Sequence, residues 1–497
     1  MIRKQTVTRG GSYRPYDSDN LTNAYLSVMQ SEMSIRKASR FFGVPYTTLN
    51  DRVAGRVDVD VIKSGTSPLF SQEQEALLSG HLKTMSEIGY GYSRQETMNL
   101  ATDYAIHLGL RGKEQKPLTD KWLFKFLGRW PELKLKKPRA LEIARAKSAT
   151  RNAIDNYFKN LKQILVKYNL LENPHRMFNI DEKGLCTEHK PPKVVAGKHR
   201  KTQAVTSSKS KIVTLIGCIN GVGQQVPPFF VFPGARMVDG LMAGASPGAA
   251  GTVTETGWSN TDIFCQFMQD HLVKYLPARD KDNPVLVLYD GHKSHCSLGL
   301  IEWAKSQHII LFVLPPHCSH ILQPLDVSCF GPFEVAWNAA CHKYMRESGG
   351  CTVTRYDVCH IACKVFTSTL TVNNITSAFR KCGLYPFNDD VVPDHQIAPA
   401  TSFSQEARPI LSKPTAATKS ADSFLVEKGG QLLKNVETAK KSRNTLSKVI
   451  AGKPITEDDV VKKHKENQTS KQKPSKSKSS KIVLQKQKTK SPTPGTS

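Results

Sequence analysis

The chain has 497 residues, which at about 100–200 residues per domain allows three or four domains. Lys and Arg total 70 against 43 Asp and Glu, and the net charge of +27 predicts a polyanionic partner, nucleic acid before an acidic membrane surface. No apolar run is long enough to span a bilayer, and the first residues lack the apolar core of a signal peptide. The eleven Cys do not suggest a disulfide framework, so we expect reduced thiols in a cytosolic or nuclear protein.

Residues 1–63 show the pattern of a helix-turn-helix domain. Apolar residues over 21–29 fall on one helix face, Ser34 is placed to cap a second helix, and a turn at 43–45 leads to a third. In the third helix Leu49 and Val53 face inward, and four side chains are expected to face outward: Tyr46, Thr47, Asn50 and Arg52. Such a polar helix can enter a DNA major groove. A small helical domain without DNA contacts is the alternative interpretation.

A second helical unit is expected over residues 67–140. Ser71–Gln74 and Ser93–Glu96 both match the capping box, in which a side chain and the backbone satisfy each other at a helix start, and Thr119 is placed to cap a third helix. Basic residues suited to phosphate contacts follow directly: Arg129, Lys134, Lys136, Lys137 and Arg139. A charge run alone would favour a solvated helix end, but two consecutive three-helix units on a basic chain shift the balance toward DNA. Residues 141–172 are interpreted as linker helices.

Residues 173–392 change to a mixture of short apolar strands and helices, which predicts an α/β domain with a mixed sheet. An Asn-Gly pair at 220–221 indicates a hairpin between two of the strands. The expected strands cover 177–181, 212–219, 226–232, 284–289 and 308–314, and the expected helices cover 262–272 and 298–305. No phosphate-binding loop of the Walker type is present, so no nucleotide-hydrolysing site is predicted.

Three acidic residues are the informative feature of this domain. Asp181 and Asp290 each end an apolar strand, and Asp326 follows the last one. An acid at the end of a buried strand is costly unless it is solvated, paired or bound to a cation. Three converging carboxylates would favour a hard cation, Mg²⁺ or Mn²⁺, over Zn²⁺. Two such ions would activate a water or a 3′-hydroxyl at a phosphodiester. Taken alone, each acid could instead be a turn residue or a helix cap.

Neighbouring residues are given lesser roles. Glu182 should point to the opposite face of the sheet from Asp181. Three histidines are expected to support the site or to touch phosphate rather than to bind the metal: His292, His295 and His320. Cys318 near two histidines, and Cys359–Cys363, leave a zinc site open, although neither has the paired spacing of a zinc motif.

Residues 393–497 are expected to be a basic disordered tail. They hold nearly half of the net positive charge and few apolar residues over 462–490, too few to offset the entropy of ordering. The tail should add nonspecific attraction to nucleic acid. Its Lys-rich stretches at 462–465 and 476–481 are the expected nuclear-import signals.

These residues carry a resemblance to the pogo/Tigger branch of the Tc1/mariner transposases. Four stretches resemble its catalytic motifs: Asn179–Lys183, Tyr289–His295, Leu314–Asp326 with Phe330–Phe333, and Ile375–Asn388. Two more resemble DNA-binding domains, of Pipsqueak type at Ser34–Arg56 and of centromere-protein-B type at Trp122–Leu133. The resemblance spans residues 15–390. It departs from the family at Lys183, where a Thr is common and where loss of the hydroxyl could alter the geometry near the metals.

The resemblance implies an RNase H-like catalytic domain preceded by two all-α helix-turn-helix domains. It implies a triad of Asp181, Asp290 and Asp326 that holds two Mg²⁺ and cuts DNA at terminal inverted repeats before joining it to a TA target. It also implies double-stranded DNA as the partner, a homodimer on that DNA, no membrane and a nuclear location.

Two hypotheses for the function follow. The first is an enzyme, a DNA transposase or a host-retained relative that still cuts. The second is a domesticated binding protein that holds DNA and regulates chromatin or transcription without cutting. A glycosidase with paired carboxylates is a poor third, because it explains neither the charge nor the helical units.

Overall fold

The computed structural model describes residues 16–57, 68–199, 201–208, 211–292, 295–403, 419–433 and 450–472. By their internal contacts the residues fall into two compact units, 1–76 with 109–112 and the remainder. Within the described residues, no helix combines the length and the apolar character that crossing a bilayer requires.

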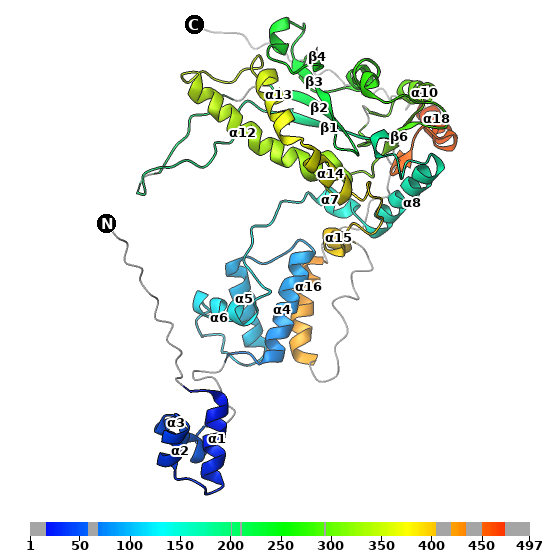
Figure 1. Ribbon diagram of the computed structural model, residues 1–497. Coiled ribbons are helices and arrows are strands. Elements are labelled where there is room, and N and C mark those ends of the chain that lie inside the picture. The colour runs from blue at the N-terminus through cyan, green and yellow to red at the C-terminus, as the bar shows by residue number, and fades with distance from the viewer. Residues whose placement is uncertain are drawn as a thin grey trace, which may run out of the picture. The chain divides into compact units, whose positions relative to one another are not determined.

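Three short helices form the first unit, at the positions expected from the sequence (Figure 1). They are α1 (Ser18–Met29), α2 (Ile35–Phe41) and α3 (Tyr46–Val53). Ser34 caps α2 by accepting a hydrogen bond from the backbone N–H of Lys37 at 3.4 Å. The helices enclose a small core of Leu21, Ala24, Ala38, Val44 and Leu49.

The second set of helices is α4 (Gln72–Glu87), α5 (Arg94–His107) and α6 (Asp120–Arg129). The expected capping box is present at Ser93 and Glu96, where each side chain bonds the other residue's backbone. Thr119 precedes α6 but makes no capping bond with its side chain. A distant helix, α16 (Lys419–Leu433), packs on α5, with the rings of Tyr104 and Phe424 stacked at 5.9 Å.

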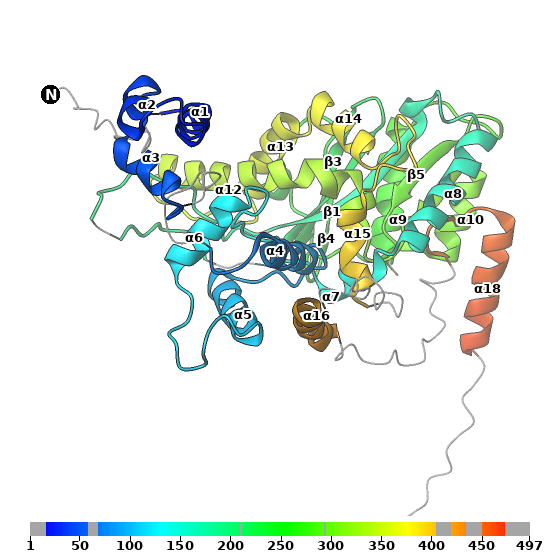
Figure 2. The same ribbon diagram turned by 90° about the horizontal axis from the view of Figure 1, so that it is seen from below.

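The α/β domain is built on a seven-stranded mixed sheet in the order β4-β3-β2-β1-β5-β6-β7 (Figures 1 and 2). The strands are β1 (Met177–Leu185), β2 (Val213–Asn220), β3 (Gln225–Pro233), β4 (Ala250–Thr254), β5 (Val285–Tyr289), β6 (Ile309–Val313) and β7 (Lys453–Pro454). The antiparallel β1-β2-β3 meander is followed by β5 and β6, which run parallel to β1. The predicted α/β class is therefore confirmed.

Strand β1 is longer than its neighbour β5, and this difference opens the sheet. β1 pairs with β2 from Phe178 to Leu185, but it pairs with β5 only from Met177 to Asn179. Beyond Asn179 the side of β1 that faces β5 has no strand beside it. The carboxyl ends of β5 and β6 border this opening, where functional sites of open α/β sheets gather.

Helices cover both faces of the sheet. Side chains alternate along β1, so Met177 and Leu185 enter one core while Phe178 and Ile180 enter the other. The first core is covered by α8 (Arg151–Lys167), α12 (Phe330–Glu347), α13 (Val358–Thr369) and α14 (Val372–Lys381). The second is covered by α9 (Thr261–Gln266), α10 (Leu298–Ser306) and α18 (Asp458–Gln472).

Short helices and turns complete the domain: α7 (Ile143–Ser148), α11 (Ser319–Leu322), α15 (Asp394–Thr401), η1 (Pro174–Arg176), η2 (Asp239–Met242), η3 (Phe267–His271), η4 (Leu272–Tyr275) and η6 (Leu325–Cys329). The helix expected over 262–272 starts as α9 and continues through a π-turn into a 3₁₀ turn. Interpreting residues 141–172 as a linker was wrong for α8. Its buried side chains belong to the core of the α/β domain: Ile154, Tyr157, Phe158 and Leu161.

Disorder over the whole of 393–497 was also a wrong prediction. In the described part of this region, β7 pairs with β6, and the backbone N–H of Ile455 donates to the Leu311 carbonyl at 2.8 Å. Four apolar side chains bury themselves against the sheet: Ile450, Ile455, Val460 and Val461. These few apolar residues do not stand out in the overall composition of residues 393–497, which is basic. The expected import stretch 462–465 lies on α18, which runs beside α10 (Figures 1 and 2), and 476–481 lies outside the described residues.

Candidate active site at the open end of the sheet

The three aspartates meet at the opening beside β1. Asp181 lies on β1, Asp290 directly follows β5, and Asp326 lies in η6. Burial, then the charges of Asp326 and Asp290, raise the pKa of Asp181 well above its ordinary value. Asp181 therefore lies within electrostatic reach of both other carboxylates, and Asp181 and Asp290, but not Asp326, line the cavity at this opening.

A histidine links two acids at this opening. His295 is buried, and its Nδ1 lies 2.8 Å from Asp290 Oδ1 while its Nε2 lies 3.1 Å from Glu182 Oε1. Burial alone would lower the pKa of His295, but the two carboxylates raise it to about 9. At neutral pH both ring nitrogens therefore carry protons and both donate. Phe264 stacks on the ring at 4.0 Å, which fixes its plane.

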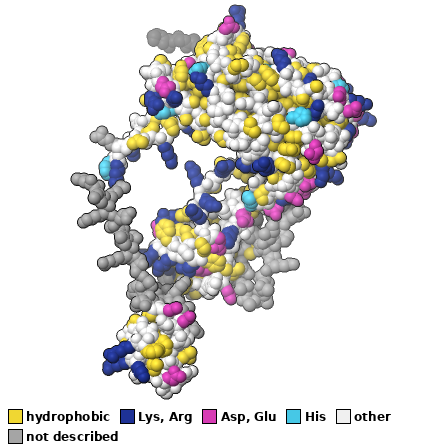
Figure 3. All heavy atoms as spheres, viewed as in Figure 1, with side chains coloured by type: hydrophobic (Ala, Val, Ile, Leu, Met, Phe, Trp, Pro, Cys, Tyr) yellow, Lys and Arg dark blue, Asp and Glu magenta, His cyan; other side chains and the backbone are white. Residues whose placement is uncertain are grey.

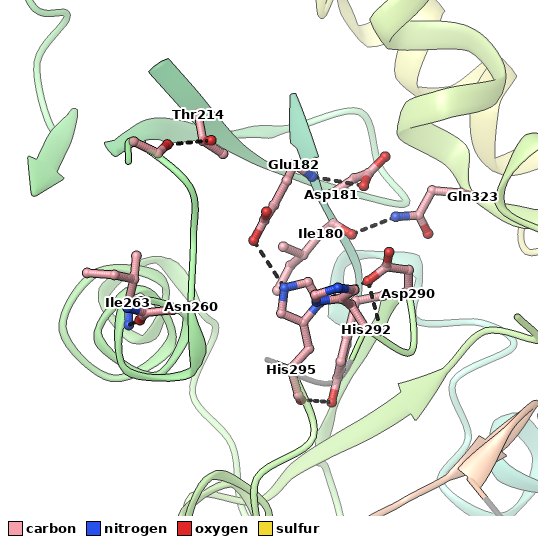
Figure 4. Close-up of polar contacts among 12 residues, drawn as sticks. Ile180, Asp181, Glu182, Thr214, Asn260, Ile263, Asp290, His292, His295 and Gln323 are labelled. Atoms are coloured by element: carbon pink, nitrogen blue, oxygen red, sulfur yellow. Dashed lines mark hydrogen bonds and ion pairs between the residues drawn. The ribbon is translucent and has the colours of Figure 1, made fainter. Parts of the chain in front are cut away.

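The imidazolium also acts on Asp290. Burial raises the pKa of this carboxyl, but the hydrogen bond and charge of His295 bring it below its ordinary value. Figure 4 shows Glu182 extending toward His295 while Asp181 points the other way, as the alternation along β1 predicts. His295 thus holds Asp290 ionised and oriented.

Two buried amides join the three segments that carry the aspartates. Asn179 Nδ2 donates to the Leu288 carbonyl on β5 and to Gln323 Oε1, each at 3.0 Å. Gln323 Nε2 donates to the Ile180 carbonyl at 2.8 Å, and the backbone N–H of Leu325 donates to Asn179 Oδ1 at 3.1 Å. Both amides are fully buried. Sequence reasoning gave these residues no role, although an Asn and a Gln within apolar runs were a signal that could have been used.

The other residues expected near the acids have varied surroundings. The backbone N–H of His292 donates to Asp290 Oδ1 at 3.4 Å. His320 lies on α11, and burial lowers its pKa while the charge of Asp326 acts in the opposite direction. Lys183, at the position that departs from the family pattern, pairs with Glu334 on α12 at 2.8 Å. Its charge is therefore engaged away from the aspartates.

A cavity of about 390 Å³ occupies the opening. Its walls combine acids, histidines and aromatic rings: Ile180, Asp181, Glu182, Trp258, Ser259, Phe264, Tyr289, Asp290, His292 and His295. No group of three or more His, Cys, Asp or Glu among the described residues is arranged to hold a metal. The chemistry of the donors nonetheless fits Mg²⁺ or Mn²⁺, because a hard cation would relieve the repulsion that raises the pKa of Asp181.

The expected DNA-contacting residues of α3 divide into two groups. Tyr46 and Thr47 are exposed and Asn50 is half-buried. Arg52 is only 7% exposed, and its Nη1 donates to the Thr48 carbonyl at 3.2 Å, so its prediction as an outward residue was wrong. Arg52 follows Leu49 by three residues and shares its inward face.

The basic residues expected after α6 are all exposed: Arg129, Lys134, Lys136, Lys137 and Arg139. Beyond α6 they lie on an irregular segment and not on a helix. Figure 3 shows Lys and Arg side chains gathered on one side of the α1–α3 unit and over the region of α4–α6. These surfaces have the charge that phosphate binding requires.

Family models match two parts of the chain. A DDE superfamily endonuclease matches residues 209–378, and a helix-turn-helix Psq domain matches 17–60. The first match contains Asp290 and Asp326 and begins after Asp181. The second covers α1–α3. These matches confirm the predicted endonuclease domain and the first of the two predicted helix-turn-helix domains.

Relatives share limited parts of the sequence. The chain is 30% identical over 243 residues to "MFS-type transporter clz9" of Cochliobolus lunatus, covering 47% of the chain and 26% of that protein. It is 42% identical over 53 residues to "Mblk-1-related factor 1" of Caenorhabditis elegans, covering 11% of the chain and 12% of that protein. The chain thus spans about a quarter of the first relative and less of the second.

The chain is similar to solved transposase structures. One is the Mos1 transposase paired-end complex with left transposon end, which matches with a TM-score of 0.38 and 13% identity over 74% of this chain and 98% of that one. The mariner Mos1 paired end complex with Mg has the same score and identity and covers 75% and 99%. The two family matches and the meander followed by two parallel strands lead to one conclusion. The chain contains a helical region that matches a helix-turn-helix Psq domain, followed by a mixed-sheet α/β domain that matches a DDE superfamily endonuclease.

Proposed function

We propose that this protein is a Tc1/mariner-type DNA transposase of the pogo/Tigger branch. It binds double-stranded DNA through its helical domains and cuts phosphodiester bonds at Asp181, Asp290 and Asp326 with Mg²⁺ or Mn²⁺. The observation that carries the proposal is the placement of Asp181, Asp290 and Asp326 on three segments that Asn179 and Gln323 tie together beside the opening between β1 and β5.

The residues of the site divide the work. Asp181, Asp290 and Asp326 would hold the cations, and His295 keeps Asp290 ionised and oriented. When bound, a pair of divalent ions supplies an activated water or 3′-hydroxyl and stabilises the leaving oxygen. Asn179 and Gln323 hold the three acidic segments in register. Phe264 stacks on His295 and packs against Tyr289. These buried rings surround the histidine with apolar groups, and an apolar environment strengthens its charge interactions.

DNA binding is assigned to both helical sets. Tyr46 and Thr47 on α3 are available for a major groove, and the exposed basic segment after α6 is available for phosphates. The α4–α6 set is proposed to be the centromere-protein-B-type domain. The net charge of +27 supports the DNA partner and, with it, a nuclear location. A homodimer on that DNA completes the proposal.

Supercoiled plasmid carrying the inverted repeats that flank the gene tests this function. With Mg²⁺, the wild-type protein should nick the plasmid, and Asp290→Asn should bind it equally but leave it intact. Asp270→Asn, an exposed acid beyond α9, is the matched control and should nick normally. Binding without nicking by the wild type would favour the regulatory hypothesis. Absence of binding to any DNA would overturn the proposal as a whole.

A further inference from the structure

A large aromatic side chain stands open beside the aspartates. Trp258 is 52% exposed, although it lines the same cavity as Asp181 and Asp290. The two other aromatic rings of this wall, Phe264 and Tyr289, are almost fully buried. Among the Phe, Tyr and Trp rings of this wall, Trp258 is therefore the one that can receive another ring from solvent.

The backbone around Trp258 is held firmly. Thr214 Oγ1 on β2 donates to the Gly257 carbonyl at 2.8 Å, and the N–H of Gly257 donates to Thr254 Oγ1 at 2.9 Å. Thr254 Oγ1 in turn donates to the Trp258 carbonyl at 3.1 Å. Gly257 has φ +79°, and a Cβ there would lie 2.2 Å from the Ile212 carbonyl oxygen, so only glycine fits this turn. The turn that carries the indole is thus already formed before a ligand binds.

The segment is anchored on its other side as well. Asn260 Oδ1 accepts a hydrogen bond from the N–H of Ile263 at 2.9 Å and starts α9 (Figure 4). The same figure shows Thr214 and its bond on the opposite side of the segment. Trp258 therefore lies between two fixed points, and little conformational entropy is lost when a ligand packs on it.

The position of the indole places it at the edge of the acidic opening. Its Cη2 atom lies 3.9 Å from the point where a Cβ on Gly184 would stand. Gly184 follows Glu182 by two residues on the same face of β1, roughly 7 Å along the strand. The ring thus flanks the Glu182–His295 pair, while Asp181 points to the other face of the strand.

We propose that Trp258 is a stacking site for an unpaired nucleobase of the DNA strand being cut, next to the phosphodiester at the aspartates. This inference rests on the proposed function. A nucleotide whose phosphate lies at the carboxylates must place its base within about one nucleotide of them. The uncharged indole attracts a base face and not the charged backbone. Bases within a duplex are already stacked, so the ligand is a base at a frayed end or one turned out of the helix.

The test uses a DNA duplex whose 3′-terminal base is an unpaired 2-aminopurine, whose fluorescence falls when it stacks. Ca²⁺ replaces Mg²⁺ so that the strand stays intact, and saturation is followed by the anisotropy of a dye at the far end. A second duplex carries the same base paired in its interior. The full-length wild type, Trp258→Ala and Trp258→Phe are compared, with Tyr356→Ala as a control for loss of an exposed ring elsewhere.

The wild-type protein should quench the unpaired base and prefer its duplex over the fully paired one. Trp258→Ala should lose the quenching and about tenfold of that preference, as expected for one base–aromatic stack. Trp258→Phe should retain most of both, and Tyr356→Ala should match the wild type.

The outcomes separate the two claims. Equal DNA binding and equal quenching in the wild type and Trp258→Ala would overturn the stacking site and leave the proposed function standing. Failure of the wild-type protein to bind either duplex would overturn both. Normal quenching combined with loss of self-association in Trp258→Ala would assign the indole to a protein contact and reject the inference.

Discussion

Asn179 Nδ2 lies 3.0 Å from Gln323 Oε1, and both side chains are completely enclosed by the protein. This amide pair connects β1 to the segment that leads into Asp326. Asn179 also bonds β5 just ahead of Asp290. Two buried hydrogen bonds of Asn179 therefore relate the three segments on which the acids lie, and its partner Gln323 is 144 residues away in sequence.

Replacing Gln323 with Met should damage both stability and the site. The Ile180 carbonyl and one amide hydrogen of Asn179 each lose a buried hydrogen bond, which costs about 1–3 kcal/mol. Asp326 loses its register, so plasmid nicking should fall by more than the loss of folded protein explains. Chemical denaturation and nicking at matched folded fractions check this. Gln396→Met, on the exposed part of α15, is the control.

Asp181→Asn should make the metal-free protein more stable while abolishing cleavage. Burial and two like charges disfavour the ionised Asp181, and the amide removes that penalty. The melting temperature should rise by a few degrees, whereas excess Mg²⁺ should raise the melting temperature of the wild type alone. Differential scanning fluorimetry measures both. Asp282→Asn, on an exposed loop, should behave as wild type. A lower melting temperature for Asp181→Asn would contradict the account.

The α4–α6 region should weaken in mild acid because of His81. Burial lowers the pKa of His81 from 6.5 to about 4, and its Nε2 lies 3.0 Å from the Tyr92 hydroxyl. Below pH 6.5 His81 binds a proton in the unfolded state but stays neutral in the folded state. Stability therefore decreases as the pH is lowered from 6.5 to about 4. The slope is about 1.4 kcal/mol per pH unit.

Hydrogen exchange over α4 and α5, corrected for intrinsic rates, should show this loss between about pH 7 and about pH 5. His81→Gln keeps a partner for Tyr92 and cannot titrate, so its protection should depend far less on pH. An identical pH profile in the two proteins would refute the assignment.

Arg52 and Lys136 should differ in how they affect DNA binding. Lys136 is exposed, and Lys136→Gln should lower the slope of log Kd against log salt by about one. Arg52 lies on the inner face of α3 and is buried. Arg52→Met should therefore destabilise the α1–α3 unit by about 1–2 kcal/mol and leave the slope of log Kd against log salt unchanged. Anisotropy titrations over a range of salt, with circular dichroism, distinguish the two. A changed slope in Arg52→Met would restore its predicted DNA contact.

Truncation should distinguish residues 450–472, which include β7 and α18, from the residues after 472. A chain ending at residue 472 should keep the stability of the full protein, because it retains β7 and α18. A chain ending at 449 exposes the edge of β6 and the pocket left by Ile455 and Val460, and it should aggregate. Light scattering and melting temperature compare them. Removing 473–497 is also the cleaner test of nuclear import, since it leaves β7 and α18 in the chain.

Local patterns carried much of the fold. The capping boxes, the helix periodicity of 16–57 and the apolar strands β1, β2, β3, β5 and β6 are each encoded by neighbours in sequence. The elements that were missed depend on distant partners. β4 is a short Gly-containing strand of half-buried residues, and β7 is two residues long within a basic region.

The same distinction applies to the candidate site. Aspartates at strand ends are visible in the sequence, and so is their need for a cation. The Asn179–Gln323 bond and the open face of Trp258 are not visible, because each depends on which segments the fold brings together. Arg52 was assigned to the wrong face because its charge was weighed above its helical position.

The pairing of β7 with β6 has a consequence for synthesis on the ribosome. β6 ends at Val313, yet the strand that covers it begins at Lys453. The N-terminal helices can fold as soon as they emerge, while the α/β domain keeps an unpaired edge until more than a quarter of the chain has been translated. A premature stop in that interval would release a chain in which the α1–α3 unit can fold while β6 keeps an unpaired edge.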